Sequence, residues 1–103
     1  MLLAGGEDKL EGALGRPEQH AHYQGADLAQ QAAVLAQGIV EAHPFQDGNK
    51  RVAMLALLAF LHENGFTVSA SKRLMAQWTL DLATGASADE IAAEIRQHLQ
   101  PLP

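Results

Sequence analysis

Ten consecutive apolar residues, from Val52 to Leu61, constrain the fold more than any other segment of this chain. A helix that is apolar on every side leaves no face for water and is expected inside a core. Ten residues are too few to cross a bilayer, which requires about 20. Gly65, shortly after the run, is typical of the residue that follows a helix end. The run therefore predicts a buried central helix from Arg51 to His62.

Helical periodicity continues on both sides of this run. Asp8 is predicted to begin a short helix, and Asp27 to cap a longer one with an apolar stripe from Leu28 to Val40. That longer helix is expected to end near Ala42, because Pro44 disfavours a helical conformation in the residue before it. We expect four or so amphipathic helices to wrap the central one in an all-α fold.

After the apolar run, Phe66 to Ser69 predicts a short extended segment. Ser71 is predicted to cap a helix that Gly85 ends, and Ser87 to Glu90 form a capping box that opens a last helix. The residues expected to face the core from these two helices are Leu74, Met75, Trp78, Leu82, Ile91, Ala92, Ile95 and Leu99.

Composition narrows the functional classes. The 103 residues form one domain of common size and contain no cysteine, which excludes disulfides and zinc-thiolate sites. Seven Lys and Arg against twelve Asp and Glu give a net charge of −5, which argues against binding to bulk nucleic acid. No signal peptide or membrane-spanning run is visible, so we expect a cytoplasmic protein.

A polar loop from His43 to Arg51 lies where the apolar helix is expected to begin. The first N–H groups of a helix lack internal acceptors, and the helix dipole adds a partial positive charge there. Gly48 allows the backbone to turn its N–H groups inward, and Lys50 and Arg51 add positive charge beside them. The loop therefore predicts a phosphate-binding site.

Two further side chains of the loop suit phosphate chemistry. Asp47 can hold Mg²⁺ against phosphate oxygens, and the imidazole of His43 can accept a proton near neutral pH. Together with the anion site, these groups predict phosphoryl or nucleotidyl transfer. Simpler roles remain open for single residues: Asn49 as a helix N-cap and Phe45 as an anchor in the core.

The loop resembles the signature of the Fic/Doc superfamily, His-Pro-Phe-x-(Asp/Glu)-Gly-Asn-(Gly/Lys)-Arg, and matches it completely from His43 to Arg51. Leu10–Pro17 and Ala53–Gly65 resemble the death-on-curing (Doc) branch, and the likeness extends from about Gly5 to Leu99. The resemblance implies a small all-α Fic bundle. It also implies a short flap before the motif, at residues 18–25.

The resemblance further implies a role for each loop residue. His43 would be the general base that deprotonates a hydroxyl of a target protein, and Asp47 would ligate Mg²⁺. Five residues would form the ATP site. Phe45 would anchor the loop in the core, and the phosphates would be held by Gly48, Asn49, Lys50 and Arg51.

Two positions favour one reaction over another. Fic proteins that transfer AMP usually carry glycine where this chain has Lys50, and a second arginine where it has Met54. Lys50 without that arginine is similar to the Doc-like pattern, whose members transfer a phosphate from a nucleoside triphosphate to a protein hydroxyl. The expected function is that of a Doc-like toxin kinase, and AMP transfer is the alternative.

The Doc-like pattern also implies partners. A toxin of this kind would modify a serine or threonine of a protein target, with translation elongation factor Tu as the target known for the branch. The sequence lacks the Ser/Thr-x-x-x-Glu-(Gly/Asn) motif of an internal inhibitory helix, so inhibition by a separate antitoxin is expected. In the flap, His22 and Tyr23 would help to dock the target.

Two other expectations complete the interpretation. Doc-like chains usually begin with a further helix before the segment that matches Gly5-Gly6, so the first family helix is expected to be missing or shortened here. The apolar surface thus exposed would be covered by an antitoxin or in a homo-oligomer. A non-catalytic nucleotide- or protein-binding module with a decayed site is the second alternative, because motif and fold do not guarantee activity.

Overall fold

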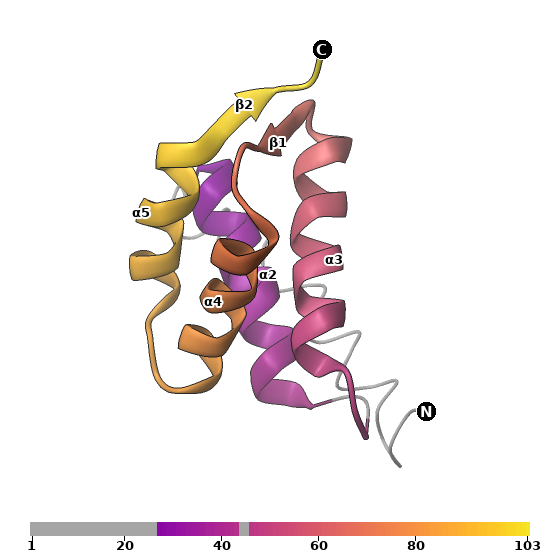
Figure 1. The fold of residues 1–103 in the computed structure, drawn as a ribbon, viewed down its shortest axis with the longest axis vertical. Helices are drawn as coiled ribbons and strands as arrows, with labels where there is room; N and C mark the ends of the chain where they lie inside the picture. Colours follow the sequence, from indigo (N-terminus) through magenta and orange to yellow (C-terminus); the bar gives the residue numbers. More distant parts are fainter. Residues whose placement is uncertain (1–26, 44–45) are drawn as a thin grey trace.

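A computed structural model of the 103-residue chain describes residues 27–43 and 46–103. The short helix predicted at Asp8, the flap at 18–25 and Phe45 lie outside these described residues. The elements are α2 (Leu28–Ala42), α3 (Asn49–Glu63), β1 (Phe66–Val68), α4 (Lys72–Ala83), α5 (Ala88–His98) and β2 (Leu99–Pro101). Four helices and one small sheet in the described ranges confirm the all-α class (Figure 1).

The central helix of the bundle is α2. Ten of its fifteen residues are buried, and α3, α4 and α5 all pack against it (Figure 1). Several of the buried residues are alanines, including Ala32, Ala33 and Ala36, which are fully covered. Because alanine has a small side chain, neighbouring helices can approach the α2 backbone closely. A buried central helix is therefore present, but it precedes the apolar run.

The expectation that the apolar run forms the buried helix is wrong. In α3 only Ala53, Leu57 and Leu61 are buried, and they form one stripe at helical spacing toward the core. Leu55, on another face, is 61% exposed. Apolar residues permit burial but do not enforce it, since apolar atoms contribute more than half of an ordinary protein surface. The outer face of α3 is therefore open while its inner face packs on α2.

The helix starts agree with the sequence. The Asp27 carboxylate accepts a hydrogen bond from the Gln30 N–H at 2.8 Å, and the Ser71 hydroxyl accepts one from the Leu74 N–H at 3.0 Å. The Ser87 hydroxyl accepts one from the Glu90 N–H at 3.2 Å, which confirms the serine half of the capping box. These short-range bonds satisfy N–H groups that a helix start leaves without acceptors.

One long-range ion pair joins α5 to the start of α2. The Arg96 Nε lies 2.7 Å from an Asp27 carboxylate oxygen, and both side chains are about half exposed. The hydrogen bond from Arg96 lowers the pKa of Asp27 below its ordinary value, and the Gln30 N–H acts in the same direction. Asp27 therefore caps one helix and holds another.

Trp78 lies at the contact between α4 and the end of α5. It is 1% exposed, and its ring centroid is 6.0 Å from that of His98, whose Nδ1 lies 2.9 Å from the Ser69 carbonyl oxygen. Leu82 is buried on the same helix, as predicted, whereas Leu74 and Met75 are only partly buried. The inner face of α4 is thus narrower than its apolar spacing indicated.

The C-terminal strand is the element that the sequence did not predict. β2 pairs antiparallel with β1, and Phe66 lies opposite Pro101 (Figure 1). Leu99 was expected inside the last helix, but that helix ends at His98. Pro101 lacks an N–H and favours an extended residue before it, so the chain leaves the helix and returns along β1.

Within the described ranges, none of the helices combines the length and the apolarity that a membrane span requires. This finding is consistent with the short apolar run in α3.

Candidate active site

The candidate site lies at the junction of α2 and α3. α2 ends at Ala42, as Pro44 predicted, but His43 itself is left-handed, with φ 47° and ψ 57°, and not extended. Its N–H donates to the Ile39 carbonyl oxygen at 3.2 Å, which closes the last turn of the helix. Left-handed backbone costs a non-glycine residue about 1–3 kcal/mol. The exposed imidazole is thus carried on a strained backbone at a helix end.

α3 begins immediately after a left-handed glycine. Gly48, with φ 79°, is the N-cap of α3. Asn49 is therefore the first helical residue, and it does not take the N-cap role that its position in the sequence allowed. The Asp47 carboxylate accepts a hydrogen bond from the Gly48 N–H at 2.8 Å, which holds the carboxylate at the start of α3.

Arg51 lies close to this helix start. A methyl group built on Gly48 would be 3.9 Å from the Arg51 Nη1, so the guanidinium lies over the glycine. Lys50 and Arg51 are both exposed, and the helix dipole adds positive charge at the same point. The arrangement suits an anion, because the backbone N–H groups of the first turn lie beside the Arg51 guanidinium and Lys50 is the preceding residue of the same turn.

Asp47 and His43 lie on the same junction and are both exposed. They are four residues apart, so their Cα atoms are at most about 14 Å from each other. The described residues contain no group of three or more potential metal-binding side chains. Mg²⁺ requires no such group, because it is commonly held by one or two carboxylates together with phosphate oxygens and water. The exposed Asp47 carboxylate fits that requirement.

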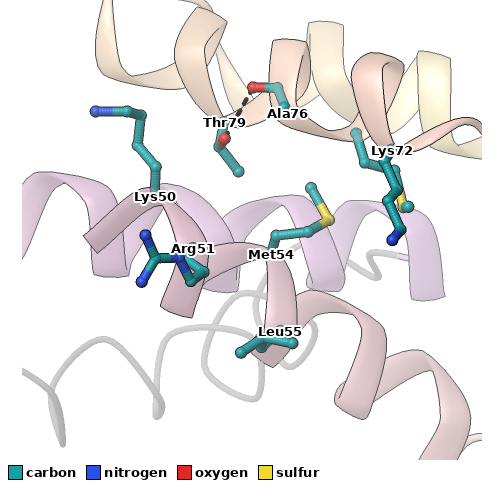
Figure 2. Close-up of a pocket in the computed structure, with 8 residues that line it drawn as sticks. Lys50, Arg51, Met54, Leu55, Lys72, Ala76 and Thr79 are labelled. Carbon is teal, nitrogen blue, oxygen red and sulfur yellow. Dashed lines mark hydrogen bonds between the residues drawn. The ribbon is translucent and has the colours of Figure 1, made fainter. Parts of the chain in front are cut away.

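A pocket of about 370 Å³ opens beside the helix start, between α3 and α4. Arg51 and Lys50 lie at one end of it, and Figure 2 shows Met54 pointing from α3 toward α4. The α4 residues in its lining were not predicted as site residues: they are Lys72, Met75, Ala76 and Thr79. No sequence signal marks them, since their position depends on how the two helices pack.

The structure thus gathers most of the predicted site. Gly48, Asn49, Lys50 and Arg51 lie at one helix start, with Asp47 directly before it and His43 across the loop. Phe45, predicted as an anchor, is outside the described residues. This arrangement combines an exposed imidazole, an exposed carboxylate and a cationic helix start.

Comparison with known proteins identifies the class. The sequence model of the Fic/DOC family matches residues 4–61, which is more than half of the chain and includes the whole loop. The chain therefore belongs to the Fic/DOC family.

A curated relative narrows the branch. The chain is similar to "Protein kinase doc" of Escherichia phage P1, with 33% identity over 85 residues. The aligned region covers 82% of this chain and 64% of that protein, so this chain spans less than two thirds of the relative's length. The similarity confirms the Doc-like branch that Leu10–Pro17, Ala53–Gly65 and Lys50 predicted.

Proposed function

We propose that this protein is a Doc-like toxin that transfers the terminal phosphate of ATP to a serine or threonine hydroxyl of a protein target. The observation that carries the proposal is the start of α3, where Arg51 lies over Gly48 beside the exposed Asp47 and His43. The similarity to a phage protein named as a protein kinase supports the same reaction class.

In this proposal His43 is the general base. Its imidazole accepts the proton of the target hydroxyl while the hydroxyl oxygen bonds to the terminal phosphorus. The bond between that phosphorus and the bridging oxygen breaks, and ADP leaves with the electron pair. The His43 N–H donates to the Ile39 carbonyl oxygen at the end of α2. This bond helps to hold the left-handed backbone from which the imidazole projects.

The negative charge of the phosphates is met by the start of α3. Arg51 and Lys50 bind phosphate oxygens, and the N–H groups of the first helical turn face the same region. Asp47 would hold Mg²⁺, which neutralises charge on the phosphate oxygens when it is bound. Because the Asp47 carboxylate also accepts the Gly48 N–H, the helix start and the carboxylate are held in one geometry.

The partners belong to the same proposal. Translation elongation factor Tu is the proposed target, and a separate antitoxin in the same cytoplasm is the proposed inhibitor. The sequence supports inhibition in trans, since it contains no internal inhibitory motif of the Ser/Thr-x-x-x-Glu-(Gly/Asn) type.

The test is to incubate the purified chain with elongation factor Tu and ATP labelled at either the terminal or the first phosphate. We expect label in the protein only from the terminal phosphate, and none with His43→Ala. Label from the first phosphate alone would replace the proposal with AMP transfer. No label from either, with ATP binding intact, would favour the non-catalytic module.

A further inference from the structure

Among the described residues, His43 is the only one other than glycine with a left-handed backbone. Its φ is 47°, and the other positive φ values in these ranges belong to Gly48, Gly65 and Gly85. A left-handed residue at a helix end is usually glycine, because a Cβ atom crowds the backbone in this conformation. The chain thus has a histidine at a position where glycine would cost less free energy.

The His43 imidazole has no orienting partner within the described residues. The hydrogen bond of this residue is from its backbone N–H to the Ile39 carbonyl oxygen, and its side chain is exposed, without a hydrogen bond or ion pair to the described part of the chain. A general base is commonly oriented by a third group that hydrogen-bonds to it. Within the described ranges, the backbone is therefore the group that can set the direction of this imidazole.

The end of α2 is a firm support for such a backbone. Ile39 and Val40, in the last turn, are 0% and 3% exposed, and α2 packs against α3, α4 and α5. The carbonyl group that accepts the His43 N–H thus belongs to a buried residue of the central helix. Groups carried on packed helices are held more precisely than groups carried on loops.

We propose that the left-handed backbone of His43 orients the imidazole for proton transfer, in place of a side-chain partner, and that the fold is less stable because of it. The inference rests on the proposed function and adds a positioning role for the end of α2. The direction of a Cα–Cβ bond follows from the local backbone conformation. A helical or an extended residue 43 would therefore direct the imidazole elsewhere.

Stability tests the backbone independently of activity. His43→Gly and His43→Ala both remove the imidazole, but glycine is favoured over alanine only where the backbone is left-handed. We expect His43→Gly to have the higher urea midpoint, with an equilibrium constant for unfolding about fivefold smaller than that of His43→Ala. An equal or lower midpoint for His43→Gly would show that residue 43 is not left-handed in solution, and the inference would be overturned.

Activity tests whether this backbone positions the imidazole. Ala42→Gly loosens the residue directly before His43 and leaves the imidazole in place. The matched control is Gln37→Gly, which loosens α2 more than one turn earlier, at another partly buried residue. Transfer from ATP labelled at the terminal phosphate to elongation factor Tu would give kcat, and calorimetry would give the Kd of Mg²⁺-ATP.

We expect Ala42→Gly to lower kcat by roughly tenfold and to leave the Kd of Mg²⁺-ATP unchanged, because small displacements of a reacting group are costly. Gln37→Gly should lower the urea midpoint and change neither constant. Parent kcat in Ala42→Gly, or an equal loss in Gln37→Gly, would overturn the positioning role. If the parent transfers no phosphate, the proposed function fails and the positioning role with it, whereas the stability order of the two His43 variants would still report on the backbone.

Discussion

α2 and α3 are adjacent helices of equal length that use apolar residues differently. α2 buries ten of its fifteen residues and contacts every other helix of the described bundle, whereas α3 buries three. Yet α3 contains the longer apolar run. The comparison shows that the number of apolar residues does not locate the core. Position among neighbouring elements does, and in α3 the surplus apolar side chains include Met54 and Leu55 beside the candidate site.

The largest expected effect is on the rate of phosphate transfer, and it tests the junction of α2 and α3. His43→Ala should reduce phosphate transfer by about 10²–10⁴-fold, because a general base contributes a factor of that order. The measurement is the rate of target labelling at saturating ATP. ATP binding should be retained, since the imidazole is not among the phosphate-binding groups. Wild-type rates in the variant would remove His43 from the reaction.

The next prediction tests the buried side chains of α2 and α3. Ile39→Ala in α2 and Leu57→Ala on the inner face of α3 should each lower the free energy of unfolding by about 2–5 kcal/mol. Both side chains are almost fully buried, at 0% and 1% exposure, so each truncation leaves a cavity. Urea denaturation monitored by circular dichroism would measure the losses. A loss below about 1 kcal/mol at Leu57 would show that the inner stripe of α3 is not packed.

A smaller effect is expected on the outer face of the same helix. Leu55→Ala should change the free energy of unfolding by less than about 1 kcal/mol, because the side chain is 61% exposed and already meets water. The same urea denaturation, compared with Leu57→Ala, isolates burial at constant chemistry. A loss equal to that of Leu57→Ala would mean that this face is covered in solution.

The smallest effect concerns the ion pair at the start of α2. The pKa of Asp27 is lower in the folded chain than its ordinary value of 3.8, chiefly through the hydrogen bond from Arg96. The ionised carboxylate therefore contributes stability above about pH 4, and this contribution is lost as the pH falls through the folded pKa.

Arg96→Gln should cost no more than about 1 kcal/mol at pH 7, since the pair is half exposed, and less as the carboxylate is protonated in acid. Urea midpoints of parent and variant at a series of pH values would measure this. A difference that stays constant from neutral to acid conditions would contradict the ion pair as its source.

Local signals predicted most of the fold. Asp27, Ser71 and Ser87 each mark a helix start because a cap involves residues only three apart in the chain. β2 could not be found in this way, since its pairing of Leu99 with Val68 joins distant segments. The partial burial of α3 could not be predicted from its apolar run for the same reason, because it depends on which elements pack against the helix.

The candidate site also has one part that local spacing predicts and another part that depends on helix packing. His43, Asp47 and Arg51 are consecutive parts of one loop and helix start, so their spacing alone predicted that they act together. The α4 side of the pocket, with Met75 and Ala76, is brought to Arg51 by helix packing and leaves no trace in the spacing. The left-handed backbone of His43 was also unforeseen, because the proline rule indicated an extended residue.

The burial of Trp78 has a practical consequence. It is the single tryptophan of the chain, so fluorescence excited at a wavelength that only tryptophan absorbs originates from one buried ring beside His98. That ring reports on the seam between α4 and α5. The intrinsic fluorescence of Trp78 can therefore show whether α4 and α5 stay packed together while nucleotide or partners are added.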